Sequence, residues 1–406
     1  MPRRRRGADI HHWPWRIAAA VLIATAGLAA CAGTLAASLR SRAPVVAHHL
    51  APWDGRLTAL AARALLTADA DVSARREAAA LSRRALLQDP TTVAAASTLG
   101  FVRSIDGDAA DARRLMRYAE RLSRRDLPTE IWAIENAVAR GDVARALGHY
   151  DTALRASGQA AGLLFPVLAT AIDNADVRTS LVGRLADRPL WQGDFLDYAA
   201  VNAPDPRAVA RLFAAIRPPA VPPSTGANAA LLTRLIDSNA PELAWRYYAS
   251  LRARADRTRS RDPRFAADVA APLPFDWVVG TEPGIVAVLR GGDEAFNFAA
   301  PPSVSGTILY QLQALPTGRY RLAGHSRGID EPDETAPFWS LSCRGGVELG
   351  RVTVTASARV GGAFGGTFAV PAGCPVQVLA LIARASSKVA GLSGQIFDVA
   401  LQPADG

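Results

Sequence analysis

The feature that most restricts the fold of this chain is an uncharged run of 23 residues, Ile17 to Leu39, which directly follows a cluster of arginines at positions 3–6 and 16. A helix of this length is about 35 Å long, and the hydrocarbon core of a bilayer is about 30 Å thick. Basic residues collect on the cytoplasmic side of membrane helices. We therefore expect a cytoplasmic Arg-rich tail (1–16), a transmembrane signal anchor (17–39) and export of the remaining chain across a bacterial inner membrane.

The same run supports a second interpretation. Leu28-Ala29-Ala30-Cys31 resembles the lipobox of bacterial lipoproteins, in which the cysteine receives the lipid, and residues 17–27 fit a secretory signal. The apolar run continues to Leu39, however, which a lipoprotein does not need. The single-pass anchor is favoured, with lipidation at Cys31 as the alternative and simple cleavage as a third. Each of the three places the bulk of the chain in the periplasm.

A period of 34 residues follows the apolar run. Two series of alanines and a pair of glycines recur at this spacing, namely Ala78, Ala112 and Ala146; Ala85, Ala119 and Ala153; and Gly107 and Gly141. Each of the two glycines precedes an Asp, and small residues on one helix allow a neighbouring helix to approach closely. The pattern resembles the tetratricopeptide repeat over residues 57–157 and continues in degenerate form to 251. It predicts an all-α repeat solenoid over 50–256, whose concave surface would bind an envelope protein.

The last third of the chain differs from the helical region in its glycine content and in its hydrophobic pattern. After a polar, Arg-rich linker (257–272), nine short β-type runs recur between 285 and 401, and 19 of the 32 glycines lie beyond 261. This pattern predicts an all-β sandwich of the jelly-roll type over 273–403. The stretch from Ile308 to Leu322 and the closing run from Leu392 to Val399 resemble jelly-roll carbohydrate-binding modules, and that resemblance implies possible glycan binding.

Two sets of side chains in this domain are candidates for function. Cys343 and Cys374 are expected to form a disulfide, because the periplasm is oxidising; two reduced, buried cysteines are the alternative. Trp277, Phe338 and Trp339 are candidates for stacking against sugar rings, and core packing is the alternative for each.

We expect no catalytic residue, cofactor or metal site. Gly324 to Gly328 match the G-x-S-x-G pattern, but an acidic loop rather than a helix follows, and no His lies beyond His325. The acidic loop Asp330–Glu334 could bind calcium, but a solvated loop is the favoured interpretation. The six His show no metal-ligand spacing, and His149 is expected to face solvent.

The net charge of +9 does not indicate a nucleic-acid partner. Residues 1–42 alone carry +6, which is the topology signal, whereas residues 262–406 carry −3. The leading hypothesis is therefore a non-enzymatic, membrane-anchored periplasmic scaffold, with a role in exopolysaccharide synthesis or export. The alternative is a carbohydrate-binding protein whose helical domain acts as a spacer, and the third is an unidentified envelope enzyme.

Overall fold

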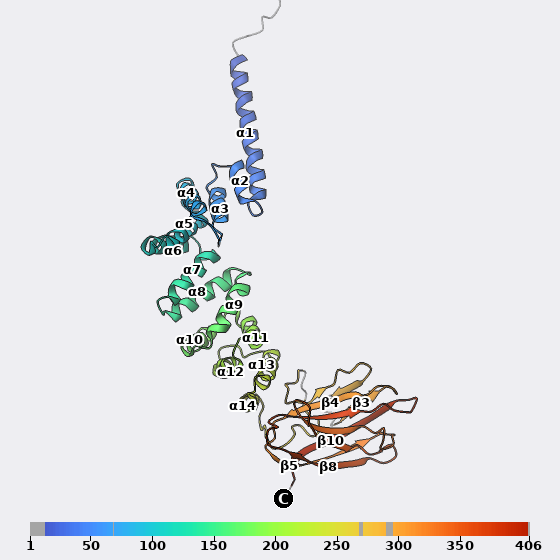
Figure 1. Ribbon diagram of the computed structural model, residues 1–406. Helices are drawn as coiled ribbons and strands as arrows, with labels where there is room; N and C mark the ends of the chain where they lie inside the picture. The colour runs from blue at the N-terminus through green and yellow to red at the C-terminus, as the bar shows by residue number, and fades with distance from the viewer. Residues whose placement is uncertain (1–12, 68, 268–270, 290–294, 405–406) are drawn as a thin grey trace, which may run out of the picture. The chain divides into compact units, whose positions relative to one another are not determined.

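The computed structural model describes residues 13–67, 69–267, 271–289 and 295–404 (Figure 1). Packing divides the chain into two compact units, residues 1–164 and 165–406. The boundary falls inside the predicted helical region, and each unit is described by itself. The predicted cytoplasmic tail before Trp13 lies outside the described residues.

The first helix, α1, contains the uncharged run. It extends from Trp13 to Leu39, and its segment Trp15–Leu39 has a mean hydropathy of 2.0 and includes an 18-residue stretch without buried residues. By length and composition this segment is able to cross a membrane. Trp13 and Trp15, at its start, are both exposed. A short helix, α2 (Pro44–Leu50), follows, and Ala36 of α1 packs with Ala47 of α2 in a small apolar cluster.

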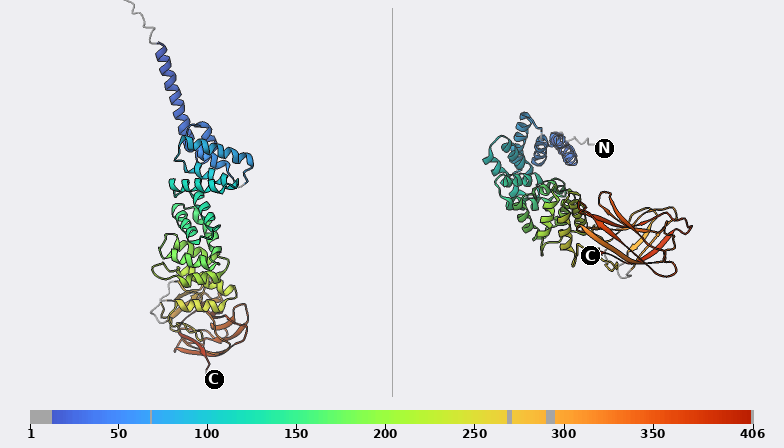
Figure 2. Two further views of the ribbon diagram at one scale, coloured as in Figure 1. Left: turned by 90° about the vertical axis from the view of Figure 1, so that its left-hand side faces the viewer. Right: turned by 60° about the horizontal axis from the view of Figure 1, so that its bottom comes forward.

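The remaining helices of the first unit pack as consecutive pairs, α3 with α4, α5 with α6 and α7 with α8 (Figure 2). Their bounds are α3 Gly55–Leu65, α4 Val72–Gln88, α5 Val93–Ile105, α6 Ala109–Leu122, α7 Leu127–Val138 and α8 Val143–Ala156, and α9 (Ala160–Ala171) begins in this unit and ends in the next. The helical fold predicted for this region is confirmed. Its identity as a tetratricopeptide repeat stays a prediction.

The repeated Gly-Asp pairs explain how two of these helical hairpins turn, α5 with α6 and α7 with α8. Gly107 and Gly141 have positive φ angles of 86° and 70°, a conformation that glycine adopts without steric cost. The Asp that follows each glycine caps the next helix, because its carboxylate accepts a hydrogen bond from the backbone N–H of Asp111 or Arg145. In each Gly-Asp pair, the glycine therefore allows the chain to turn after one helix and the Asp caps the start of the next.

The alanines at 34-residue spacing lie in the helix interfaces. All six have exposed fractions of 4 % or less, and the intervening Ser82, Met116 and Tyr150 are buried as well. A Cβ atom added to Gly100 on α5 would lie 3.1 to 3.2 Å from the Met116 side chain on α6. The small residues therefore set how closely the paired helices approach.

The second unit continues with α10 Ala175–Leu185, α11 Gln192–Asn202, α12 Pro206–Ala215, α13 Thr225–Asp237 and α14 Pro241–Leu251. The segment after α14 is packed in place rather than free. Arg257 makes two hydrogen bonds to the carboxylate of Glu242, and the Arg261 guanidinium lies 5.1 to 5.7 Å from the rings of Trp245, Tyr248 and Phe275. The described arginines of the predicted linker 257–272 are therefore held by aromatic, carboxylate and carbonyl groups, and the bounds of the linker stay a prediction.

Asp276 joins the last helix to the β domain. Its carboxylate accepts hydrogen bonds from Tyr248 (2.6 Å) and Arg252 (2.8 Å). Burial alone would raise the pKa of Asp276, but these hydrogen bonds outweigh it and hold the pKa below its ordinary value. Burial raises the pKa of Tyr248.

The β domain is a sandwich of two five-stranded antiparallel sheets, as predicted. One sheet has the order β1-β4-β9-β6-β7 and the other the order β2-β3-β10-β5-β8. The strands are β1 Val278–Val279, β2 Val286–Leu289, β3 Phe296–Ala300, β4 Gly306–Gln313, β5 Gly318–Arg327, β6 Phe338–Cys343, β7 Glu348–Thr353, β8 Gly362–Val370, β9 Gln377–Ala383 and β10 Leu392–Pro403. The nine predicted strands are present, and among the described residues the two-residue β1 is the one addition.

Candidate functional site

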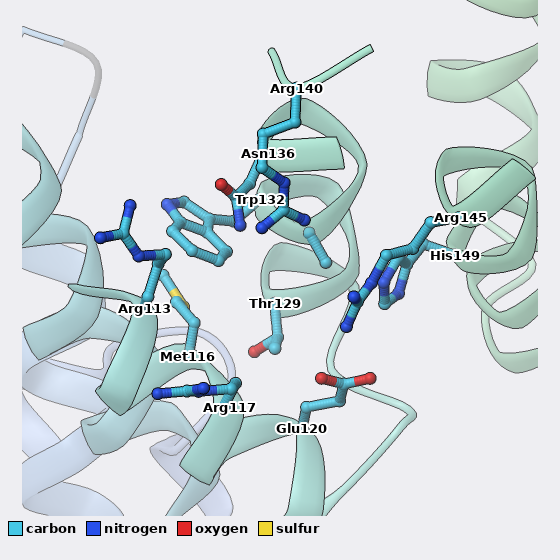
Figure 3. A pocket seen from close by; sticks show the side chains of 11 residues that line it. Arg113, Met116, Arg117, Glu120, Thr129, Trp132, Asn136, Arg140, Arg145 and His149 are labelled. Carbon is cyan, nitrogen blue, oxygen red and sulfur yellow. The ribbon is translucent and has the colours of Figure 1, made fainter. Parts of the chain in front are cut away.

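A cavity of about 130 Å³ in the first unit gathers arginines from three segments (Figure 3). We call it the arginine pocket. Its cationic residues are Arg113 and Arg117 on α6, Arg140 in the turn after α7, and Arg145 on α8. Within the described part of the chain, none of the four makes an ion pair, whereas the neighbouring Arg103 and Arg114 both pair with Asp111. The pocket therefore carries a net positive charge, which Glu120 in its lining offsets only in part, and this favours an anionic group.

The same pocket contains an aromatic ring and an amide. Trp132 and Asn136 lie one turn apart on α7, and Figure 3 shows both side chains among the arginines. The indole N–H of Trp132 donates to Ser104 Oγ at 3.5 Å, which leaves the ring itself beside the cavity. The lining thus combines cationic, amide and aromatic groups.

A buried carboxylate–imidazole pair lies next to the pocket. Glu130 is 1 % exposed, and its Oε2 lies 2.8 Å from Nδ1 of His149, whose side chain is only 13 % exposed. This corrects the expectation that His149 faces solvent, since Glu130, 19 residues away in sequence, holds it in the helix interface. Oε1 of Glu130 has no hydrogen-bond partner within the described ranges.

Glu120 completes a group of three residues with metal-ligand chemistry. One ligand atom each from Glu120, Glu130 and His149 lie within 4.8 Å of one another. The four arginines of the pocket oppose a divalent cation at this place, because like charges repel strongly where solvent is partly excluded. We therefore assign no metal to the group. We treat the Glu120 carboxylate as a hydrogen-bond acceptor in the lining of the pocket (Figure 3).

The three aromatic residues predicted to stack on sugars are all buried, Trp277 and Trp339 in the sandwich core and Phe338 beneath two arginines. Trp277 is 3 % exposed and Trp339 is fully buried, with ring centroids 5.7 Å apart. Phe338 is 6 % exposed, and the guanidinium groups of Arg351 and Arg384 cover its ring at 4.7 and 4.5 Å. None presents a free ring face, so the stacking prediction is corrected to core packing for Trp277 and Trp339 and to packing against two guanidinium groups for Phe338.

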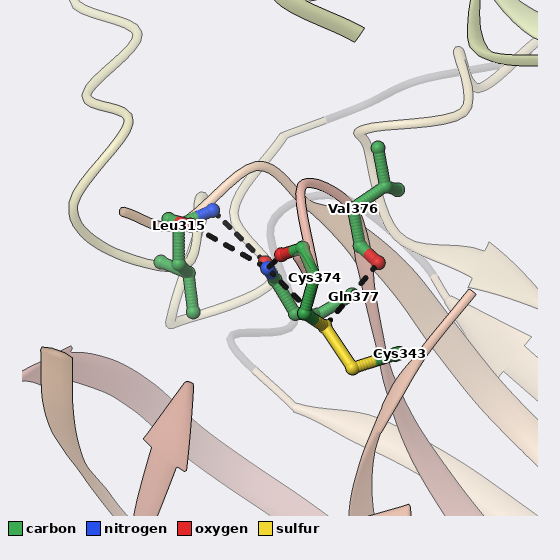
Figure 4. The surroundings of a disulfide bond; sticks show 5 residues. All are labelled: Leu315, Cys343, Cys374, Val376 and Gln377. Atoms are coloured by element: carbon green, nitrogen blue, oxygen red, sulfur yellow. Dashed lines mark hydrogen bonds between the residues drawn. A yellow bond between two sulfur atoms is a disulfide. The ribbon is translucent and has the colours of Figure 1, made fainter. Parts of the chain in front are cut away.

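The predicted disulfide between Cys343 and Cys374 is confirmed (Figure 4). It joins the end of β6 to the turn before β9, two neighbouring strands of one sheet. The side chain of Gln377 braces the same turn, since its Oε1 accepts a hydrogen bond from the backbone N–H of Leu315 at 2.9 Å. Cys31, the lipidation candidate, lies exposed on α1 as a free cysteine.

The two sequence motifs considered for catalysis and calcium binding have structural roles. Ser326 lies within β5 and is 1 % exposed, whereas its neighbour His325 projects from the opposite face of the strand. Ser326 therefore sits on no strand-to-helix turn. In the acidic loop, Glu331 is buried and accepts hydrogen bonds from Ser386 and Thr335.

The outer face of the sheet β2-β3-β10-β5-β8 carries a patch of polar side chains that the sequence did not identify. We call it the polar face, and it consists of Asn297, His325, Arg327, Gln395, Phe397 and Asp398. Asn297, Gln395 and Arg327 are cross-strand partners in one row over β3, β10 and β5. Gln395 donates to Asn297 at 2.6 Å.

A β-bulge shapes this patch. The pairing of β10 with β5 shifts between Ile396 and Asp398, so Phe397 is the extra residue. Ile396 is buried in the core, Phe397 is half-buried, and the Arg327 guanidinium lies 5.0 Å from the Phe397 ring. Asp398 pairs with His325 at 2.8 Å, and the two side chains are 44 % and 62 % exposed. Bulges re-aim side chains in this way, and a single sequence gives no signal for them.

Comparisons with known proteins yield similarity for part of the chain only. No protein-family profile matches it, and no curated protein matches its sequence. A solved structure described as "CBM4 structure and function" is 16 % identical, covers 36 % of this chain and 99 % of its own, and has a TM-score of 0.28. The module TmCBM61 in complex with β-1,4-galactotriose is 18 % identical, covers 37 % and 100 %, and has a TM-score of 0.26.

A third solved structure is the enzymatically active domain of tailspike protein 4 from bacteriophage CBA120. It is 13 % identical, covers 31 % of this chain and 19 % of its own, and has a TM-score of 0.23. The description of the β domain as a sandwich rests on its strand pairing and not on these similarities.

Proposed function

We propose that this protein is a membrane-anchored, extracytoplasmic glycan-binding protein whose β-sandwich holds the glycan on the polar face. The apolar helix α1 supports membrane attachment, and the disulfide supports an oxidising compartment. The observation that carries the proposal is the row of polar side chains from three strands beside the bulged Phe397.

The chemistry of the polar face suits a sugar. Sugar hydroxyls both donate and accept hydrogen bonds, and Asn297, Gln395 and Asp398 together offer amide donors and carboxylate or carbonyl acceptors. The half-buried ring of Phe397 offers an apolar surface for the C–H side of a pyranose. Because these groups project from paired strands, their spacing is set by the sheet before any ligand binds, which reduces the entropic cost of binding.

The helical region has its own predicted role. Docking of an envelope protein along the helices stays a prediction, as do a function in exopolysaccharide synthesis or export and the absence of catalysis. Co-purification of a partner that mutation of the helical surface abolishes would support the docking role.

The test uses the full chain in detergent micelles and a panel of immobilised neutral and acidic polysaccharides. We expect retention of at least one polysaccharide and a loss of affinity of about fivefold in Gln395→Ala, since one hydrogen bond contributes about 1 kcal/mol. Phe397→Ala should lower the affinity by a similar factor.

Gln402→Ala is the matched control, because Gln402 is an exposed glutamine on the same strand outside the polar face. It should bind like the unaltered protein. The proposal fails if the full chain retains no polysaccharide, or if Gln395→Ala and Phe397→Ala bind as tightly as the control. Circular dichroism of each variant shows whether the sandwich is intact.

A further inference from the structure

We infer that the arginine pocket is a second binding site, in the first unit, and that it takes a carboxylate-bearing sugar ring such as a uronic-acid residue of an acidic polysaccharide. This inference goes beyond the proposed function, because the pocket shares no residue with the polar face. Either site is able to exist without the other.

The first step concerns charge. Four guanidinium groups from α6, the turn after α7 and α8 line one small cavity, and no described carboxylate forms an ion pair with them. Arginine binds carboxylates through two parallel N–H bonds, so two neighbouring arginines on α6, Arg113 and Arg117, are suited to hold one carboxylate. The ligand therefore carries at least one negative charge.

The second step concerns size. The cavity volume is about 130 Å³. A protein cavity of about 150 Å³ holds a single six-membered ring, so the arginine pocket has room for one ring and not for a larger fused system. A side chain of Trp132 beside this volume supplies an aromatic surface for a ring to lie against.

The third step concerns hydroxyl groups. The lining carries both signs of charge, because the negative Glu120 lies among the residues of the pocket together with the four positive arginines. A second carboxylate of a ligand would be repelled by Glu120, whereas hydroxyl groups would donate hydrogen bonds to it and to the Asn136 carbonyl. One carboxylate and several hydroxyls on one ring match this lining better than the multiple carboxylates of an acidic peptide.

The experiment measures binding of trigalacturonic acid to the full chain in detergent by isothermal titration calorimetry. Galactotriose is the neutral counterpart, and pentaglutamate represents an acidic peptide. We expect trigalacturonic acid alone of the three to bind in the arginine pocket, with affinity that falls as salt concentration rises. The double variant Arg113→Gln/Arg117→Gln should lose about tenfold or more in affinity, because it removes two charge-assisted donors.

The matched control is Arg76→Gln/Arg83→Gln, which removes the same charge from exposed positions of α4 outside the pocket. It should bind normally. Trp132→Ala should weaken binding and Trp132→Phe should restore it, which separates loss of the ring from loss of the fold. Equal binding of pentaglutamate, galactotriose binding that the Arg113/Arg117 variant weakens as much as trigalacturonate binding, or no effect of this variant on trigalacturonate would each overturn the inference. Variants of the polar face, such as Phe397→Ala, should leave trigalacturonate binding in the pocket unchanged.

Discussion

Removal of the disulfide in the double variant Cys343→Ala/Cys374→Ala should destabilise the β-sandwich through the unfolded chain. The bridge spans a sequence separation of 31 residues. For a loop of this length the chain-entropy relation gives a loss of about 12 cal/mol/K, or about 3.7 kcal/mol at 25 °C. The loop contains β7 of one sheet and β8 of the other, so without the bridge the unfolded chain gains freedom in strands from both layers.

The native structure gives a reason for the folded state to survive this change. Gln377 holds the turn at Cys374 independently, through its hydrogen bond with Leu315 and a second to the Cys374 carbonyl (Figure 4). β6 and β9 also remain paired over six residue pairs. The loss of stability should therefore come from the unfolded state, and the fold of the variant should be unchanged.

Hydrogen exchange followed by mass spectrometry measures the effect locally in the full chain. The slowest amides of β6 and β9 should exchange about 500-fold faster in the variant, since each 1.4 kcal/mol is a factor of ten. Peptides of the first unit serve as an internal control, and Cys31→Ala should leave the sandwich unaffected. A change of less than about tenfold at β6 and β9 would refute the loop-entropy reasoning.

The remaining predictions concern the helix turns, pH and the membrane segment. Gly141→Ala should destabilise the first unit by about 1 kcal/mol, because φ is positive there. Gly183→Ala, on the exposed face of α10, should instead stabilise its helix by up to about 1 kcal/mol. Hydrogen exchange of the amides in α7 and α10 measures both effects. The folded-state pKa of Asp276 is lowered, so the stability that its carboxylate contributes is complete above the ordinary pKa and is lost as the pH falls from about 4 toward the folded-state pKa. Urea unfolding between pH 6 and pH 3 should show this loss of stability. The variant Asp276→Asn should not show it. A reporter fused after residue 45 should be active only in the periplasm, and cytoplasmic activity would contradict the proposed topology. Cys31→Ala should stay membrane-bound, and its release into the soluble fraction would instead support the lipoprotein alternative.

The prediction of the architecture succeeded where a local pattern has one physical meaning. An uncharged run of helix length, Gly-Asp pairs at a fixed period and short β-type runs between glycines each report on their own segment. Gly141 illustrates this, because a positive φ angle and a following helix cap are both properties of adjacent residues. The disulfide was predictable because only two cysteines lie in the β domain.

The candidate sites were much less predictable, because they depend on residues that are distant in sequence. Tryptophan is a residue type typical of sugar-binding sites. The strand register nevertheless decides the direction of each side chain, and it places Trp277 and Trp339 in the core. Arg261 seemed to belong to a polar linker, but three aromatic rings surround it. His149 has no metal-ligand neighbour in sequence, and only helix packing brings it to Glu130.

The amino-acid sequence by itself determined the order of the parts: an apolar helix, paired helices built on small residues, and a sandwich closed by one disulfide. Backbone preferences and hydrophobic spacing act over a few residues, so they can be recognised in the sequence alone. Only the tertiary structure decided which side chains meet. The arginine pocket needs α6, α7 and α8 to pack together, and the polar face needs three strands in register and a bulge at Phe397. Charge and hydrogen bonding act through space, and it is the packed fold that sets those distances.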